Sequence, residues 1–471
     1  MGEKNGPELP YLHPSNHSTN SCVDLLNIRR ETSGMKCQPI PLSETRLWQW
    51  ESGKLVHKTG GFFSLIGLRG IAVSDESYNE QPFIHQPEVG ILGNLIRNGN
   101  GNPQILVQAK SEPGNVGNVQ LSPTVQATVS NYTRIHKGAP TPYLEHFLSP
   151  KPNSIFSDSL QSEQGNRFLG KYNRNLTVLV NGDGPDPVSE VWRWCDVDSL
   201  LSALPIEFAV NTDLRSVLAV SDWDLLAGEK KPFGLWRGHG GFGEALLDSL
   251  FAINGECELP TSAILGILER LRKKTPLGPA GCSLAKLAGW NLNADRLVDE
   301  EEKLFEVRGY RVHAPDREIT HWDQPLVRDL GQGEVLLACQ LRNGILHFLL
   351  RPSWEMGFLE GIQFGPSLQK PQTLEIFPPP DVSDPVSDLI LQGDYTDHIS
   401  THFSEEGGRF FQSISLYKIV EFPESVLIPD SDEYCWVTLG QIRQLLKSPG
   451  NFTNEARSAI ALLLSYLPGP S

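Results

Sequence analysis

Polar and apolar side chains alternate along residues 124–136, whose sequence is "TVQATVSNYTRIH". The positions from Val125 to Ile135 that share one face are mostly β-branched or small, whereas the face from Thr124 to His136 consists of hydrogen-bonding side chains. A period of two with β-branched residues predicts a strand. Similar patterns predict the other elements, with strands at 61–73, 104–110, 119–135 and 176–180 and helices at 196–204 and 212–220. Strands followed by packing helices indicate an α+β fold.

This succession of patterns occurs twice, because a shift of 242 or 243 positions superimposes the two halves of the sequence. The segment "FFSLIGLR" aligns with "LFEVRGYR", and "EPGNVGNVQLSPTVQ" aligns with "EMGFLEGIQFGPSLQ". An internal repeat of this length predicts two copies of one module. We therefore expect a polar lead-in with a first helix at 1–41, a first repeat at 42–223, a connector at 224–283 and a second repeat at 284–471.

Two amphipathic segments between the repeats, "GFGEALLDSLF" and "TSAILGILERLRKK", predict helices. In the second segment Ile264, Leu268 and Leu271 fall on one face, opposite charged residues. Residues 224–283 are therefore expected to form a helical connector whose apolar stripe packs on both repeats. Contact across a dimer is the alternative for this stripe.

Composition disfavours several classes of function. The 471 residues carry a formal net charge of -16, which opposes binding to nucleic-acid phosphates. No stretch approaches the roughly 18 apolar residues that span a bilayer, and the polar first residues are not expected to act as a secretory signal. Seven cysteines without a C-x-x-C pair favour reduced thiols in a cytoplasmic protein over a structural zinc site.

Candidate chemistry concentrates in the first repeat. Counting in twos brings one set of side chains together on two neighbouring strands: Lys110, Glu112, Tyr132, Arg134 and His136. Two cations suit a pyrophosphate, and a histidine beside a carboxylate can transfer protons near neutral pH. The second repeat has Ser353 in place of Lys110 and no counterpart of the arginine or the histidine. A solvated strand face is the alternative interpretation of this set.

Several longer motifs resemble those of one enzyme family. They are "HQPEVGILG", "QAKSEPGN", "QLSPTVQATVSNYTRIHKG" and "YLEHF" in the first repeat, and "DREITHWDQPLV" and "GILHFLLRP" in the second. Over almost its full length, duplication included, the chain is similar to the NDP-hexose 2,3-dehydratases of bacterial deoxysugar pathways. The resemblance implies tandem modules of Nudix-like fold, each able to hold a nucleotide. It also implies a homodimer and a reaction that needs no metal or organic cofactor.

The substrate implied by this resemblance is a dTDP-4-keto-6-deoxyhexose. Its C4 ketone acidifies the C3 hydrogen, so a base can remove that proton and hydroxide can leave from C2. The product is a 3,4-diketo-2,6-dideoxy sugar nucleotide, formed without a redox change. Such a product is prone to lose its nucleotide, so we expect functional coupling to a 3-ketoreductase.

The residue roles in this reaction are hypotheses. His136 or Glu112 would remove the C3 proton, and the other would protonate the leaving hydroxyl. Lys110 or Tyr132 would support the enolate, and Arg134 would neutralise the pyrophosphate. The remaining candidates would hold sugar hydroxyls or, for the tryptophans, stack on thymine: Gln120, Gln126, Thr128, Asn131, Trp192 and Trp194. Core packing is the alternative for both tryptophans.

Two other functions compete with this reading of the sequence. A Nudix pyrophosphate hydrolase needs a helix with the pattern R-E-x-x-E-E, but Arg30-Glu31 is followed by "TSG" and Arg317-Glu318 by "ITH". This difference disfavours hydrolysis. The second alternative is a non-catalytic nucleotide-sugar-binding protein of the same fold, against which the complete first-repeat set argues.

Overall fold

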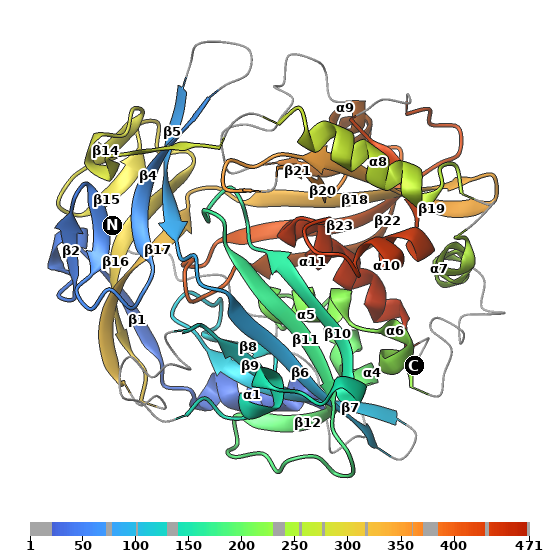
Figure 1. Cartoon of the computed structure of the whole chain (residues 1–471), viewed down its shortest axis with the longest axis horizontal. Coiled ribbons are helices and arrows are strands. Elements are labelled where there is room, and N and C mark those ends of the chain that lie inside the picture. Colours follow the sequence, from blue (N-terminus) through green and yellow to red (C-terminus); the bar gives the residue numbers. More distant parts are fainter. Residues whose placement is uncertain are drawn as a thin grey trace.

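The computed structural model describes residues 21–71, 78–99, 102–129, 140–228, 241–253, 257–275, 278–315, 319–359, 361–370, 385–428 and 433–468. Among these residues, each half of the chain forms a seven-stranded sheet and most of a five-stranded sheet. Figure 1 shows the two small sheets at one end of the molecule and the two large sheets at the other, with helices between the large sheets. The α+β class and the two similar, sheet-rich halves are confirmed.

The large sheet of the first half contains β6 (Gly90–Gly99), β7 (Asn102–Ser111), β8 (Val119–Ser122), β9 (Val125–Ala127), β10 (Ile155–Ser162), β11 (Tyr172–Leu179) and β12 (Trp192–Asp196). Its strand order is β10-β11-β6-β7-β12, with β8 beside β7 and β9 beside β6. β11 runs parallel to β6, whereas β7 is antiparallel to β6, β8 and β12.

The second half repeats this topology with β18 (Gly333–Arg342), β19 (Ile345–Ser353), β20 (Gln363–Gly365), β21 (Leu368–Lys370), β22 (Thr396–Ser404), β23 (Ile414–Phe422) and β24 (Cys435–Thr438). The order is β22-β23-β18-β19-β24, with β20 beside β19 and β21 beside β18. β23 again runs parallel to β18. The same order and directions in both sheets agree with the duplication found in the sequence.

The predicted strand at 119–135 is wrong in its extent. It divides at Pro123 and Thr124 into β8 and β9, and β9 ends at Ala127. Proline has no N–H for a strand ladder. The Thr124 hydroxyl instead accepts a hydrogen bond from a backbone N–H of β6 at 2.9 Å and donates one to a carbonyl of β7. A side chain therefore replaces backbone pairing at this point, while residues 130–139 lie outside the described structure.

The small sheets exchange strands between the halves. One contains β2 (Trp48–Glu51), β3 (Lys54–His57), β4 (Ser64–Ile71) and β5 (Tyr78–His85) together with β13 (Ala280–Cys282), which directly precedes the second repeat. The other contains β14 (Trp290–Leu292), β15 (Arg296–Asp299), β16 (Phe305–His313) and β17 (His321–Asp329) together with β1 (Lys36–Ile40), which directly precedes the first repeat. The strand that leads into each repeat thus pairs with the other repeat, β1 with β16 and β13 with β4.

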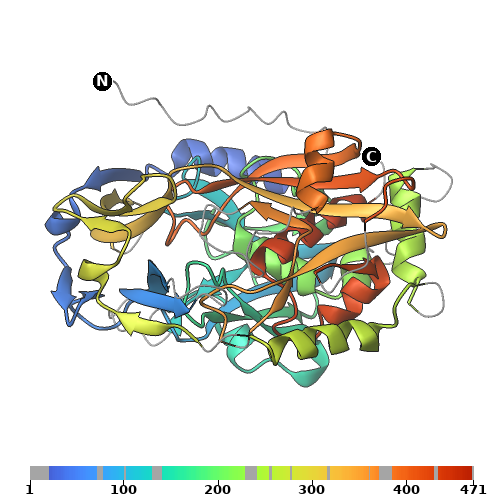
Figure 2. The same ribbon diagram turned by 90° about the horizontal axis from the view of Figure 1, so that it is seen from above.

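Reciprocal contacts join the two small sheets. Trp48 Nε1 donates to the Asp323 carbonyl at 3.1 Å, and Trp290 Nε1 donates to the Glu80 carbonyl at 2.8 Å. Both indole rings are buried in one apolar cluster drawn from both repeats. The small sheets therefore share a core, and Figure 2 shows them side by side at one end of the molecule.

Two helices related in the same reciprocal way lie at the centre of the molecule (Figure 1). They are α5 (Thr212–Val220) and α11 (Asn454–Leu463), which pack against each other. Arg215 Nε donates to Ser458 Oγ at 3.2 Å, and Arg457 Nε donates to Ser216 Oγ at 2.9 Å. Both arginines are 1 % exposed. Each repeat therefore satisfies a buried cation of the other, across a local twofold axis.

The other α-helices of the described residues are α1 (Cys22–Thr32), α3 (Glu145–Leu148), α4 (Val197–Ser202), α6 (Trp223–Ala227), α7 (Phe242–Phe251), α8 (Thr261–Arg272), α9 (Pro385–Gln392) and α10 (Leu439–Leu445). Helices α4 and α5 form where the sequence predicted them. Helices α7 and α8 form in the two amphipathic segments between the repeats. α7 packs on α10 and β19, and Arg272 of α8 donates to the carbonyls of Ile362 and Gly450, so both helices contact the second half.

Gly114 is a point of close contact between the halves. Its N–H donates to the Gly407 carbonyl at 2.8 Å, and a Cβ at Gly114 would overlap the Phe410 carbonyl oxygen. Gly114→Ala should therefore lower the free energy of unfolding by about 1–3 kcal/mol in urea titrations. The matched control is Gly266→Ala in α8, where a Cβ would meet nothing within 4 Å. That change should stabilise the helix by up to ~1 kcal/mol, and equal effects of both changes would contradict the expectation.

Candidate active site

Lys110 and Glu112 form an ion pair at the end of β7, with Lys110 Nζ 2.8 Å from Glu112 Oε1. β8 places Gln120 opposite Lys110, and Gln126 of β9 donates to Glu112 Oε1 at 3.3 Å. Glu112 is 3 % exposed, and among the described residues its Oε2 has no hydrogen-bond partner. Buried polar atoms in folded proteins are almost always hydrogen-bonded, so this oxygen is suited to meet a ligand.

The turn that follows Glu112 fixes it at the end of the strand. Glu112 N donates to the Asn118 carbonyl at 3.0 Å, and Asn118 N donates to the Asn115 carbonyl at 3.1 Å. Gly117 and Asn118 have positive φ angles of 72° and 65°. Glycine and asparagine adopt this conformation more readily than other residues, which explains why the sequence "EPGNVGN" closes a tight turn here.

A loop of the second half, residues 404–410 with the sequence "SEEGGRF", borders this turn. A Cβ built on Gly408 would lie 2.9 Å from Glu406 Oε1 and 3.5 Å from Glu112 Oε1. The two carboxyl groups therefore converge on a position that has no side chain. The first-half site is completed by the other repeat, because Glu406 reaches it through this loop.

The same loop contributes a hydrogen bond and a cation. Gln120 Nε2 donates to Ser404 Oγ at 2.6 Å. Arg409 donates to Gln86 Oε1 from Nε at 3.1 Å and from Nη2 at 2.8 Å, and its guanidinium lies 4.3 Å from the centre of the Phe63 ring. Because Gln86 is neutral, this contact leaves the positive charge of Arg409 available to an anionic ligand.

Burial alters the protonation of two carboxyls around the site. Glu406 is partly accessible to solvent, yet burial of its carboxyl raises its pKa, against the effect of Arg409 and with a further increase from Glu112. Asp213 lies in the first turn of α5, where burial raises its pKa well above the ordinary range and Glu406 and Glu163 add to the increase. The cluster therefore combines a paired carboxylate with carboxyls that favour their neutral form.

Both repeats match the family model of the NDP-hexose 2,3-dehydratases, over residues 19–220 and 261–463. The chain belongs to this family. It is 35 % identical over 436 residues to a dTDP-4-dehydro-6-deoxy-alpha-D-glucopyranose 2,3-dehydratase of Streptomyces violaceoruber, which covers 89 % of this chain and 91 % of the relative. Proteins of the same name from Saccharopolyspora spinosa and Amycolatopsis orientalis are 34 % identical over 440 residues and 31 % identical over 445 residues. These alignments cover 90 % and 92 % of this chain, and 87 % and 88 % of the relatives.

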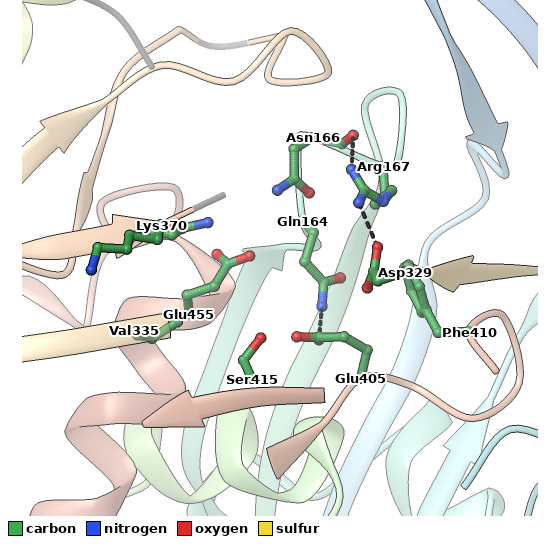
Figure 3. A pocket seen from close by; sticks show the side chains of 11 residues that line it. Gln164, Asn166, Arg167, Asp329, Val335, Lys370, Glu405, Phe410, Ser415 and Glu455 are labelled. Atoms are coloured by element: carbon green, nitrogen blue, oxygen red, sulfur yellow. Dashed lines mark hydrogen bonds and ion pairs between the residues drawn. The ribbon is translucent and has the colours of Figure 1, made fainter. Parts of the chain in front are cut away.

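The second half of this NDP-hexose 2,3-dehydratase family member has a pocket at the equivalent place (Figure 3). Side chains from both halves line it, because Gln164 and Arg167 come from the first repeat and Glu405 and Glu455 from the second. Gln164 donates to Glu405 Oε2. Glu355 is the counterpart of Glu112, and backbone N–H groups of the first-repeat loop donate to it. Burial raises the pKa of Glu355 to about 7. The two sites thus have the same construction.

Five positions of the described residues differ in charge between the sites. In each pair the first-half residue is given before its second-half counterpart: Lys110 and Ser353, Gln86 and Asp329, Glu406 and Gln164, Lys171 and Ser413, Ala127 and Lys370. As a consequence, Arg167 pairs with a carboxylate at 2.7 Å, whereas its counterpart Arg409 faces a neutral amide. Of these two arginines, Arg409 therefore has the positive charge that is less neutralised by its hydrogen-bond partner.

The structure brings four predicted site residues together: Lys110, Glu112, Gln120 and Gln126. Thr128 follows directly after β9. Asn131, Tyr132, Arg134 and His136 lie outside the described residues. Trp192 is half-buried on the strand beside β7, opposite Gln108, where its Nε1 donates to the Thr124 carbonyl at 3.1 Å.

Trp194, the other tryptophan proposed to stack on thymine, lies in an enclosed environment. It is 5 % exposed, with the guanidinium of Arg97 4.4 Å from its ring centre, and its Nε1 donates to the Pro185 carbonyl at 3.0 Å. A Cβ at Gly184 would lie 2.7 Å from the same ring. These contacts favour the alternative of core packing for Trp194, while its stacking on thymine stays a prediction.

The sequence pattern did not identify five further charged residues that surround the site and interact electrostatically with one another: Glu163, Lys171, Asp213, Glu406 and Arg409. The signal lay in the aligned loops "SEQGNRF" and "SEEGGRF", which differ in charge at Gln164 and Glu406. Assigning Glu406 to the first-half site requires knowing that the repeats exchange contacts.

No helix in the described part of the chain is long and apolar enough to cross a membrane.

The buried carboxyls of the second-half pocket predict a pH dependence of stability. Burial raises the pKa of Glu405 and of Glu455 to about 8, from an ordinary value of 4.5. Their stabilising effect is therefore complete below pH 4.5 and is lost as the pH rises to about 8. Within that window the free energy of unfolding should fall as the pH rises, because the folded state keeps protons on these carboxyls that the unfolded state has already released. Urea titrations should show this decline and a flatter profile for Glu455→Gln, whereas a stability that rises with pH would contradict it.

Proposed function

We propose that the chain is a dTDP-4-keto-6-deoxyhexose 2,3-dehydratase of deoxysugar biosynthesis and that it works in the first-half site. The observation that carries the proposal is the ion pair of the half-buried Lys110 with the buried Glu112, whose Oε2 has no partner among the described residues. Family membership and the names of the relatives support the substrate class.

The reaction needs a base at C3, a donor at the C4 oxygen and an acid at the C2 hydroxyl. Glu112 is the proposed base, because its free oxygen is buried and its other oxygen is fixed by Lys110 and Gln126. Lys110 supports the negative charge on the C4 oxygen after the C3–H bond breaks. The enolate then expels hydroxide from C2, and the resulting enol tautomerises to the 3,4-diketo sugar, so that one water is lost.

Binding of the nucleotide requires cations and donors around these groups. Arg134, and among the described residues Arg409, are proposed to hold the diphosphate. The proposed ligands of the sugar and thymine are Gln120, Gln126, Thr128, Asn131 and Trp192. Tyr132 and His136 remain alternatives for enolate support and for proton transfer.

The finer features implied by the family resemblance belong to the same proposal. Each half would be a Nudix-like module, residues 224–283 would act as a helical connector, and the working protein would be a cytoplasmic homodimer. A 3-ketoreductase would consume the product. The argument for the 3-ketoreductase is chemical, since a 3,4-diketo-2-deoxy sugar nucleotide readily eliminates its nucleotide.

Solvent exchange at C3 tests the function. The 4-keto sugar nucleotide is incubated with the full-length protein in D₂O, and deuterium at C3 and loss of water are followed by mass spectrometry and NMR. We expect deuterium at C3 of the recovered substrate and at C2 of the product, loss of one water and, without reductase and NADPH, accumulation of free dTDP. The alternative, a non-catalytic nucleotide-sugar-binding protein, would bind dTDP but leave C3 unexchanged.

A further inference from the structure

Glu406 is held beside Glu112 although the two residues belong to different repeats. Two N–H groups further along its loop donate to the Glu406 carbonyl at 3.0 and 2.9 Å and close a turn. Gly114 forms two backbone hydrogen bonds with this loop, one to the Gly407 carbonyl and one from the Gln412 N–H, both of 2.8 Å. The loop and the turn after Glu112 therefore form one structural unit, which fixes the positions of both carboxyls.

Gly408, which has no side chain, lies next to both carboxyls. A Cβ there would lie within 3.5 Å of both Glu406 Oε1 and Glu112 Oε1. Burial raises the pKa of Glu406, against the effect of Arg409 and with a further increase from Glu112. Lys110 forms an ion pair with Glu112, which favours Glu112 as the base and leaves Glu406 as the neighbouring carboxyl for the role of acid.

The equivalent position in the second-half site carries an amide. Gln164 donates from Nε2 to Glu405 Oε2 and has no acidic proton to transfer. The same site also has Ser353 where the first-half site has Lys110. Among the described residues of the two sites, a lysine paired with the glutamate at the strand end and a carboxyl at the loop position of Glu406 therefore occur together only in the first-half site.

We propose that Glu406 is the general acid that protonates the C2 hydroxyl as it leaves, so that the second repeat supplies a catalytic residue to the site of the first. This inference rests on the proposed function. Glu112 takes the C3 proton, the C3–H electrons form the enolate, and cleavage of the C2–O bond then produces the C2=C3 double bond.

The proton transfers balance over one turnover. Glu406 gives its proton to the departing hydroxide, which becomes water. Protonated Glu112 then returns its proton to C2, while the enol hydroxyl at C3 gives its proton to the Glu406 carboxylate. Both residues regain their starting states, and no oxidant or reductant is consumed.

Glu406→Gln in the full-length protein tests the assignment, because glutamine keeps the shape of the side chain but removes the acid. Loss of water should slow by at least ~10²-fold, the lower range for a lost general acid. Deuterium exchange at C3 should continue in the recovered substrate, since Glu112 still forms the enolate. Glu406→Asp should restore part of the water loss. Glu112→Gln should remove both reactions, which separates the acid from the base.

Three measurements complete the test. Thermal unfolding and dTDP calorimetry establish that Glu406→Gln is folded and binds nucleotide. Gln164→Asn, the matched change in the other loop, should leave water loss within about twofold. Normal turnover in Glu406→Gln, or equal loss of exchange and water loss in a folded variant, would overturn the assignment. The assignment would also be overturned if His136→Gln lost water slowly but still exchanged C3 while Glu406→Gln turned over normally. A wild-type protein that neither exchanges C3 nor loses water would refute the proposed function, and the acid assignment with it.

Discussion

Glu112→Gln should lower kcat for loss of water by at least ~10²-fold, because it removes the proposed base without changing the size of the side chain. Lys110→Met should have an effect of similar size, since it removes the donor for the developing charge on the C4 oxygen. Lys110 Nζ lies 2.8 Å from Glu112 Oε1, so both changes affect one unit and their effects should not add in the double variant. Steady-state kinetics on purified 4-keto sugar nucleotide measures all three variants.

The matched control is Glu355→Gln, at the position equivalent to Glu112 in the second half. It should leave kcat within a few-fold, because that site has Ser353 in place of the lysine. Affinity for dTDP, measured by calorimetry, separates lost chemistry from lost binding. Should Glu355→Gln abolish turnover while Glu112→Gln remains active, the reaction would have to be placed in the second half.

Local pattern was sufficient to predict the part of the site that lies on consecutive strands. Lys110 and Gln120 are predicted near Glu112 because strands that follow each other closely in sequence tend to pair, as β7 and β8 do. Gln126 reaches Glu112 from β9, which pairs with β6. The same reasoning overextended the strand beyond Ala127. Alternation shows which face a side chain occupies, but not that a threonine hydroxyl will take the place of backbone pairing.

Contacts between distant segments could not be predicted in this way. Glu406 reaches Glu112 only because the repeats pack about a local twofold axis, and 294 residues separate the two in sequence (406 − 112). Asn211, which caps α5, donates to Gln126 Oε1 at 3.2 Å, so α5 begins beside Gln126. Only this position of the helix identifies Asp213, in its first turn, as a residue of the site. The repeat alignment identified equivalent residues without showing which copies meet.

The two repeats, expressed separately as residues 21–275 and 276–468, should each fail to fold, whereas co-expression should give a stable complex. Each piece would lose the lead strand that pairs with it, β13 for the first and β1 for the second. Each would also expose its face of the α5–α11 contact, where Arg215 and Arg457 are 1 % exposed and bonded to serines of the other repeat. Full burial of one aliphatic or aromatic side chain is worth about 1.5–3 kcal/mol, and whole domains are stable by only about 5–15 kcal/mol.

Loss of the several large side chains that the repeats bury against each other should therefore exceed the stability available to either piece. The main core draws on both repeats, with Leu214 and Leu218 from one and Ile460 and Leu463 from the other. Near-ultraviolet circular dichroism and urea titration of each purified piece provide the measurement, and the co-expressed pair is the control. A cooperative unfolding transition in an isolated piece would show that a single repeat is an independent domain. In that case the strand exchange would add to the stability of the halves without being required for their folding.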